Sequence, residues 1–329
     1  MIRNTAKTAL LALFSATALG NTAGDVKVES RSSIMPAGFS RCLFYDDFSQ
    51  APGSLPDSSK WQIDLGTRYA NGGPKNWGTG EIQVYTDHTQ NVHITHDQTL
   101  KITPVRSNNG SWTSARIETT ADWDFACPEG ERMRVEARLK LGGQSQKNAL
   151  GIWPAFWLLG SGYRNNYSAW PAVGEIDIME SVNGLDKMWH TIHCGKYPGG
   201  VCNEPNGIGH PTKNVPRSSW HTIALDVDRR HPAGHGKQSM SWLIDGETRW
   251  TVHESNLTSP GNSTASQAWK ALVANPKMLL FNVAVGGALP NAFSGIDTPT
   301  NATRGGDGAS MEVDYAAVYL TSTGLALPL

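Results

Sequence analysis

Residues 174–181 read Gly-Glu-Ile-Asp-Ile-Met-Glu-Ser, and this stretch carries three carboxylates within six residues. Acids alternate with branched apolar residues over its central positions, a pattern typical of a β-strand. On such a strand Glu175 and Asp177 share one face, while Ile176 and Ile178 point into a core. A strand that is merely solvated has little reason to stack like charges on one face. The pattern therefore predicts a strand that holds acids together for chemistry.

The position of Glu180 sharpens this prediction. Strict alternation would turn Glu180 into the core, where an unpaired carboxylate is too unfavourable to expect. A β-bulge near Ile178 and Met179 adds one residue and returns Glu180 to the acidic face. The path from Glu175 to Glu180 then behaves like four strand steps, roughly 13 Å between Cα atoms. Two Glu side chains that lean over Asp177 could bring their carboxyls to about 5–5.5 Å, the separation of a retaining glycosidase.

Strand-like patterns recur along the chain between turns rich in Gly and Pro. Residues 132–141 place Met, Val, Ala, Leu and Leu on one face and charged residues on the other, whereas only residues 264–275 look helical. Further strand-like runs occupy residues 221–228, 241–246, 278–285 and 311–320. Many short strands favour an all-β sandwich or barrel. We expect one domain over residues 37–329.

Residues 1–20 predict a secretory signal peptide, because basic residues precede a short apolar run that ends in a small-x-small triplet. The run is too short to span a membrane and no other long one follows, so we expect no membrane partner. Residues 21–36 read as a leader before the domain. A formal net charge of −1 without a long basic run argues against nucleic-acid binding. We therefore expect a secreted, extracellular protein.

The four cysteines fit that compartment, and the absence of Cys-x-x-Cys favours disulfides over a metal site. A Cys194–Cys202 bond would close a short loop of Gly and Pro, and elimination then pairs Cys42 with Cys127, although four cysteines allow three pairings. Asn-x-Ser/Thr sequons agree with secretion. They begin at Asn109, Asn166, Asn256, Asn262 and Asn301.

Beyond the acidic strand, the chain resembles glycoside hydrolase family 16, the laminarinases and mixed-linkage β-glucanases, including their fungal secreted members. The likeness is carried by the Glu-x-Asp-x-x-Glu triplet and by Gly-Ile-Trp-Pro-Ala-Phe-Trp at residues 151–157. Other matching segments lie at residues 46–48, 76–83, 112–118, 170–174, 193–195, 281–287 and 313–315. The resemblance implies a concanavalin-like jelly-roll β-sandwich with a concave substrate cleft.

The resemblance also implies catalytic roles. Glu175 matches the nucleophile, which forms a glycosyl-enzyme, and Glu180 matches the acid/base, with Asp177 assisting between them. We expect the neighbouring negative charges to raise the pKa of Glu180. The reaction requires no cofactor. Asp314 matches a residue that helps to hold a structural Ca²⁺ in some relatives, but we identify no further ligands for the ion.

Sugar rings present apolar C–H faces, so a cleft that binds them needs flat aromatic side chains. The chain is rich in Trp, with 12 Trp against 8 Tyr and 8 Phe. By family match Trp157 and Trp170 are sugar platforms, and Trp153, which points the same way as Trp157, lies either in the cleft or in the core. The resemblance assigns sugar contacts on the non-reducing side to Asn76, Trp77, Glu81 and Arg116.

Three basic residues need separate treatment. For Arg116 the alternative to a sugar contact is a plain surface salt bridge. His193 follows the triplet by one hairpin, so it either reaches the cleft or is structural. His190 lies three residues earlier and should face the other side of the strand.

These features together predict a monomeric retaining endo-β-glucanase whose polysaccharide substrate is β-1,3 or mixed β-1,3/1,4 glucan. One alternative is a transglycosylase on the same site, and another is a hydrolase of a different polysaccharide such as a β-galactan. A non-catalytic glucan-binding module would need Trp platforms but not the acidic triplet, which weighs against it. The segments that decide the substrate lie at residues 142–150, 160–169 and 196–211, in loops whose shape the pattern does not give.

Overall fold

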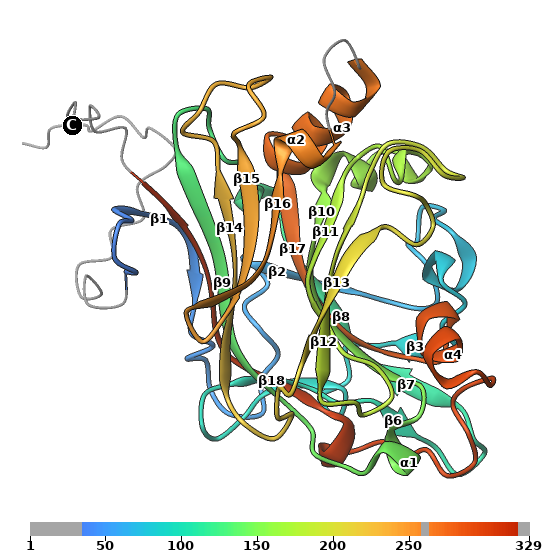
Figure 1. The fold of residues 1–329 in the computed structure, drawn as a ribbon. Helices are drawn as coiled ribbons and strands as arrows, with labels where there is room; N and C mark the ends of the chain where they lie inside the picture. Colours follow the sequence, from blue (N-terminus) through green and yellow to red (C-terminus); the bar gives the residue numbers. More distant parts are fainter. Residues whose placement is uncertain (1–34, 258–262, 322–329) are drawn as a thin grey trace, which may run out of the picture.

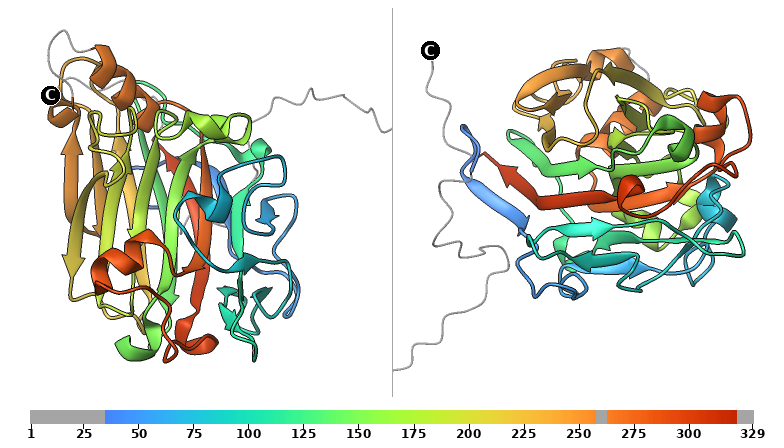
Figure 2. Two further views of the ribbon diagram at one scale, coloured as in Figure 1. Left: turned by 90° about the vertical axis from the view of Figure 1, so that its right-hand side faces the viewer. Right: turned by 90° about the horizontal axis from the view of Figure 1, so that it is seen from below.

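The computed structural model describes residues 35–257 and 263–321, which build a sandwich of two large antiparallel sheets (Figure 1). Views from the side and from below show the sheets stacked as two layers (Figure 2). The predicted signal peptide and nearly all of the predicted leader lie outside the described residues. Strand patterning in the sequence therefore led to the correct architecture.

The seven-stranded sheet carries the acidic stretch at its centre. In order across the sheet its strands are β13 (Ile208–Lys213), β12 (Lys187–His193), β11 (Glu175–Glu180), β10 (Ile152–Gly160), β17 (Lys277–Val285), β8 (Arg116–Thr119) and β2 (Trp61–Asp64). All neighbouring pairs are antiparallel. Strands β11 and β12 form a hairpin, whereas β10 and β17 meet from distant parts of the chain.

The eight-stranded sheet packs against the back of the first. Its path runs through β16 (Glu247–His253), β15 (Ser239–Ile244), β14 (His221–Asp228), β9 (Arg132–Leu141), β18 (Met311–Leu320), β5 (Leu100–Ile102) and β4 (Val92–Ile94), and β1 (Arg41–Asp46) pairs with β18. A small third sheet contains β3 (Val84–Tyr85), β7 (Trp112–Ser114) and β6 (Val105–Arg106). Strands β14 and β18 have the bounds that the alternating pattern predicts.

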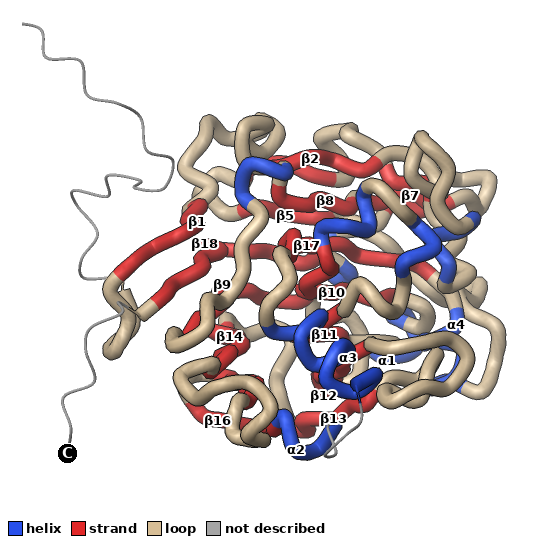
Figure 3. Tube along the Cα trace, turned by 90° about the horizontal axis from the view of Figure 1, so that it is seen from above, coloured by secondary structure: helices blue, strands red, loops and turns tan. Residues whose placement is uncertain are grey.

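Helices are short and lie at the rim and ends of the sandwich (Figure 3). The α-helices are α1 (Gln146–Ala149), α2 (Glu254–Leu257), α3 (Ser263–Val273) and α4 (Ala288–Ser294), and the other helical segments are short 3-10 turns. Helix α3 confirms the predicted helical segment and covers one end of the sandwich together with α2 (Figure 1). None of the helices in the described ranges is long and apolar enough to cross a membrane.

One large apolar core fills the space between the two sheets. Strand β9 supplies its predicted face, from Met133 to Leu141, and its charged residues point the other way. Phe156 and Phe281 stack with ring centroids 4.8 Å apart. Each such fully buried side chain contributes about 1.5–3 kcal/mol relative to an exposed one. The core therefore fixes the strands on which the acids stand.

Of the two predicted disulfides, one is confirmed and one is wrong. Cys194 and Cys202 are bonded. Cys42 and Cys127 are not joined. Cys42 packs in an outer cluster, because β1 pairs with β18 in a register that turns it away from the core, whereas Cys127 is 1% exposed inside the main core. Elimination failed because the two thiols lie in different apolar clusters.

Candidate active site

Strand β11 contains the predicted β-bulge. Between Asp177 and Glu180 the pairing with β12 shifts, so that two residues of β11 oppose one residue of β12. The pairing with β10 shifts at the same place. The two residues in between, Ile178 and Met179, are both 0% exposed within the core. Glu180 therefore returns to the face that carries Asp177, which is called the acidic face below.

Two hydrogen bonds from distant side chains hold the bulge. His190 Nδ1 lies 2.8 Å from the Ile178 carbonyl oxygen, and because a carbonyl can only accept, Nδ1 carries the proton. The other ring nitrogen then accepts from Thr212 Oγ1 at 3.0 Å, and burial lowers the pKa of His190 to about 4. Trp242 Nε1, from the other sheet, donates to the Asp177 carbonyl at 3.0 Å. His190 thus faces away from the acidic face, as predicted.

Each of the two glutamates receives a hydrogen bond from an indole. Trp153 Nε1 donates to Glu180 Oε1 at 2.9 Å, and Trp170 Nε1 donates to Glu175 Oε2 at 3.1 Å. Glu180 and Asp177 are 8% and 5% exposed, whereas Glu175 is half-buried. Trp153 is half-buried on the acidic face, so the core alternative for this residue is wrong.

Burial raises the pKa values of the three acids above those of solvent-exposed carboxylates. It raises the pKa of Glu180 to about 7, and the charge of Glu175 adds to the rise. The predicted direction is correct, but burial outweighs the neighbouring charge as its cause. Burial also raises the pKa of Glu175, and it raises the pKa of Asp177 well above its usual range with help from both glutamates. The cluster can therefore hold a proton near neutral pH beside an ionised carboxylate.

His193 joins the acidic cluster rather than serving only the structure. Its Nε2 lies 3.5 Å from Asp177 Oδ2, and its Nδ1 lies 2.7 Å from Glu204 Oε2. Burial disfavours the charged ring, but the hydrogen bond to Glu204 and the charges of Glu175 and Asp177 raise the pKa of His193 to about 10. Ligand atoms of Glu175, Asp177 and His193 lie within 4.8 Å of one another. His193, Glu175 and Asp177 therefore form one compact cluster on the acidic face.

Arg116 is a buried residue of β8 in the same sheet. It is 5% exposed, and its Nε donates to Asp64 Oδ2 at 2.8 Å. The guanidinium also lies 4.5 Å from the ring centroid of Trp77 and 4.9 Å from that of Trp157. The ion pair is therefore buried rather than at the surface, and the cation also contacts the rings of Trp77 and Trp157.

A hydrogen bond fixes the orientation of the Trp157 indole. Trp157 is half-buried, and its Nε1 donates to Asn282 Oδ1 at 2.8 Å, which fixes the plane of the indole. The predictions did not include Asn282, yet a signal was present, since Asn282 is a lone amide within the apolar run of β17.

The segment predicted to contact sugar on the non-reducing side has an unusual backbone. Asn76 and Trp77 have φ angles of 51° and 54°, a left-handed conformation that is rare for a bulky residue. Trp77 is buried, whereas Asn76 is half-buried. Glu81 is also buried, and it accepts hydrogen bonds from Gln83 Nε2 at 2.6 Å and Tyr85 OH at 2.8 Å. Asn76 has the accessible side chain of the three, while Trp77 and Glu81 form the layer beneath.

The predictions did not include two exposed aromatic side chains near the acids, Phe293 and Tyr197. Trp189 is the strand partner of Glu180, and its ring centroid lies 4.4 Å from that of Phe293 on α4. Phe293 is 46% exposed. Tyr197, on the disulfide-closed loop, is 60% exposed and lies 6.3 Å from the Trp170 ring. Sequence reasoning missed them because the ring contacts that place them near the acids form only in the folded chain.

Asp314 lies in β18 of the eight-stranded sheet, far from the acids. Its Oδ2 accepts from Arg138 at 2.7 Å. A Ca²⁺ ion at this carboxylate would have to compete with the guanidinium, so the contacts of Asp314 do not favour the ion. Ca²⁺ binding here stays a prediction.

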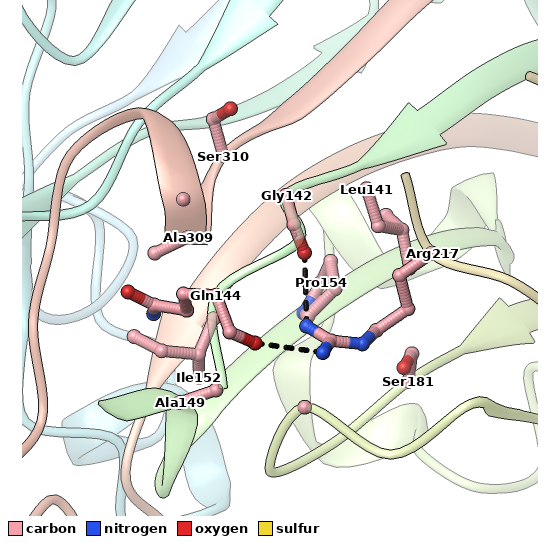
Figure 4. Close-up of a pocket in the computed structure, with 12 residues that line it drawn as sticks. Leu141, Gly142, Gln144, Ala149, Ile152, Pro154, Ser181, Arg217, Ala309 and Ser310 are labelled. Atoms are coloured by element: carbon pink, nitrogen blue, oxygen red, sulfur yellow. Dashed lines mark hydrogen bonds between the residues drawn. The ribbon is translucent and has the colours of Figure 1, made fainter. Parts of the chain in front are cut away.

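A small cavity lies beyond the end of β11 (Figure 4). Arg217 crosses it and donates to the carbonyl oxygens of Gly142 and Gln144 at 2.9 and 2.7 Å. The cavity has a volume of about 20 Å³, which suffices for about one water molecule. The cavity is therefore structural and cannot admit a sugar.

Comparison with known proteins agrees with this site. A family model described as "XgeA-like, catalytic GH16 domain" matches residues 145–220, which include the whole acidic triplet. The crystal structure of an endo-1,3-beta-glucanase from Streptomyces sioyaensis shares 42% sequence identity with a TM-score of 0.79, over 88% of this chain and 98% of that chain. The chain belongs to glycoside hydrolase family 16. The predicted resemblance and the jelly-roll fold class are thereby confirmed, and the protein is a glycoside hydrolase.

Two curated proteins extend the comparison. A beta-glucanase of Rhodothermus marinus is 28% identical over 284 residues, which cover 84% of each chain. The glucan endo-1,3-beta-glucosidase A1 of Niallia circulans is 28% identical over 312 residues, or 90% of this chain. The chain spans only 40% of the length of that second protein.

Proposed function

We propose that this family 16 hydrolase is a secreted, retaining endo-β-glucanase that cleaves β-1,3 or mixed β-1,3/1,4 glucan. The observation that carries the proposal is the bulged strand, which brings Glu175, Asp177 and Glu180 to one face with an indole donor on each glutamate. The 42% identity to an endo-1,3-beta-glucanase over nearly the full length of that chain supports the choice of substrate.

In the first step Glu175 acts as the nucleophile and Glu180 as the acid. Glu175 attacks the anomeric carbon, the glycosidic C–O bond breaks, and the Glu180 proton moves to the departing oxygen. A pKa of about 7 suits Glu180 for this donation near neutral pH. The positive ring of His193 opposes the effect of burial on Glu175 and favours its ionised form.

In the second step the roles of the two glutamates differ. Once Glu175 is an ester it carries no charge, so one contribution to the raised pKa of Glu180 disappears. Glu180 then takes a proton from water, and the resulting hydroxide oxygen displaces Glu175 with retention of configuration. Asp177 lies between the two glutamates in the sequence and is positioned to hydrogen-bond Glu175 as the charge moves.

The Cys194–Cys202 disulfide supports the proposal of secretion, because disulfides persist in oxidising compartments. The half-buried indoles of Trp153, Trp157 and Trp170 are suited to stack against successive sugar rings on the acidic face.

The test compares the wild-type enzyme with Glu175→Gln on laminarin and on barley mixed-linkage glucan. We expect Glu175→Gln to lose at least ~10³-fold in kcat, as is common when a nucleophile is removed. Glu247→Gln is a matched control, because Glu247 is an exposed acid on the other sheet, paired with Arg249. Product anomers followed by NMR should show retention.

Three outcomes would contradict the proposal. Unchanged activity of Glu175→Gln rules out Glu175 as the nucleophile. An inverted product rules out the double displacement. A predominance of elongated chains when an acceptor glucan is added would make the enzyme a transglycosylase instead of a hydrolase.

A further inference from the structure

Glu204 is a buried acid on the loop after β12, and it contacts His193 directly. Its side chain is 0% exposed. Glu204 Oε2 accepts from His193 Nδ1 at 2.7 Å, and Oε1 accepts from the backbone N–H of Cys194 at 2.7 Å. Both oxygens are thus used by donors on consecutive residues. A buried carboxylate needs such partners to be tolerated.

The loop holds the carboxylate and the ring in a fixed relation. The Cys194–Cys202 disulfide closes it. Within it, Gly199 and Glu204 exchange two backbone hydrogen bonds at 2.8 and 2.7 Å. Past Glu204, the backbone of Gly207 packs so closely on the ring that a Cβ there would lie 2.8 Å from Cε1 of His193.

The opposite side of the ring faces the acidic cluster. His193 Nε2 lies 3.5 Å from Asp177 Oδ2, an oxygen that makes no hydrogen bond within the described residues. The acids that face the ring are Glu204 from the loop and Glu175, Asp177 and Glu180 from β11. The Trp170 ring packs beside it with centroids 5.7 Å apart. Both ring nitrogens therefore point at carboxylates, an arrangement that suits an imidazolium, in which both nitrogens donate.

We propose that Glu204 is a positioning residue for the reaction: it keeps His193 protonated and directed at Asp177, so that one positive charge stays beside the catalytic acids. This inference rests on the proposed function. Four buried or half-buried acids surround one imidazole, and without a cation their mutual repulsion would favour protonation of the nucleophile. Glu204 sustains that cation from the side of the ring opposite to Asp177. The loop thereby sets the charge of the active site, although none of its residues reacts with the substrate.

The test is a titration of His193 by NMR in the full-length protein labelled at histidine Cε1. The His193 signal is assigned by its loss in His193→Gln. In Glu204→Gln we expect the pKa of His193 to fall by ~2 pH units, because the charged acceptor is gone. Glu204→Asp keeps the charge and should retain most of the elevated value. Asp186→Asn is the control, since it removes one negative charge at the other end of the β11–β12 hairpin, from a side chain that is 65% exposed.

A second readout is the pH profile of kcat/KM on laminarin. The ratio of Glu204→Gln to wild type should stay within about threefold near pH 5.5, where the ring is charged in both proteins, and fall by roughly 3–10-fold further near pH 8.5. An unchanged His193 titration in Glu204→Gln overturns the proposal. So does an activity loss that is equal at both pH values, which indicates a merely structural role. If the wild type releases nothing from any glucan, the proposed function fails, while the His193 titration still tests the role of Glu204.

Discussion

Replacing Trp153 by Phe removes the indole N–H that donates to Glu180 Oε1 at 2.9 Å and keeps an aromatic ring in its place. The donor stabilises the ionised form of Glu180, so its loss must raise the pKa of Glu180 further above the present value of about 7. A hydrogen bond to a charged group is worth about 1.5–3 kcal/mol, and we take ~1.5 kcal/mol because Trp153 is half-buried and water replaces part of the loss. That free energy corresponds to about one pH unit.

The sign of the effect on activity follows from the role of Glu180. An acid must hold its proton, so kcat/KM falls as the pH rises through the pKa of Glu180. The alkaline limb of the kcat/KM profile of Trp153→Phe should therefore move up by about one pH unit. The assay is initial-rate hydrolysis of a soluble laminari-oligosaccharide across the pH range in which both proteins stay folded.

Trp170→Phe is the matched control, because its indole serves the other glutamate at 3.1 Å. Glu175 must be ionised to attack, so a raised pKa of Glu175 moves the acid limb up and leaves the alkaline limb in place. The two limbs describe a coupled cluster rather than single residues, and the comparison therefore depends on which limb moves. An alkaline limb that stays fixed or moves down in Trp153→Phe, or that moves equally in Trp170→Phe, would refute the assignment of acid and nucleophile.

Three further predictions concern the strand and the aromatic rim. Deleting Met179 makes the strand regular and leaves Glu180 on the acidic face, so kcat/KM should fall far less than in Glu180→Gln. The loss of this core side chain should lower the free energy of unfolding by about 2–5 kcal/mol, measured by urea titration. His190→Leu leaves the Ile178 carbonyl without its donor and should lower the free energy of unfolding by about 1–3 kcal/mol. The same substitution should cost less in the Met179 deletion variant, because the bulge is absent there. Phe293→Ala should raise KM for long glucans about 2–10-fold with little change for short ones, since an aromatic contact is worth ~0.5–1.5 kcal/mol; an equal change for both lengths would contradict a role in binding chain ends.

Much of the fold and site could be predicted from local pattern. The alternation of residues 132–141, 221–228 and 311–320 becomes β9, β14 and β18 because side-chain direction in a strand depends only on position along it. The bulge could be inferred for the same reason, since a buried, unpaired Glu180 was the only alternative. The short spacing between Cys194 and Cys202 likewise made their pairing foreseeable.

Other features depend on which distant element covers a residue, and local pattern carries no information on that. The Arg116–Asp64 pair is buried because aromatic side chains from three separate segments close over it. Cys42 and Cys127 fail to pair because strand register turned one of them outward.

The sequence by itself determined that three acids share a strand and that the second glutamate must rejoin the first, because an ionised side chain avoids an apolar core. Only the tertiary structure decided how the bulge is held, with Trp242 donating to the Asp177 carbonyl across the sandwich. It also decided the charge of the site, because the pKa of each acid depends on burial and on the imidazolium of His193, which a loop acid sustains. Electrostatic interactions and desolvation act through space between groups far apart in the chain, so they become definite only once the chain has folded.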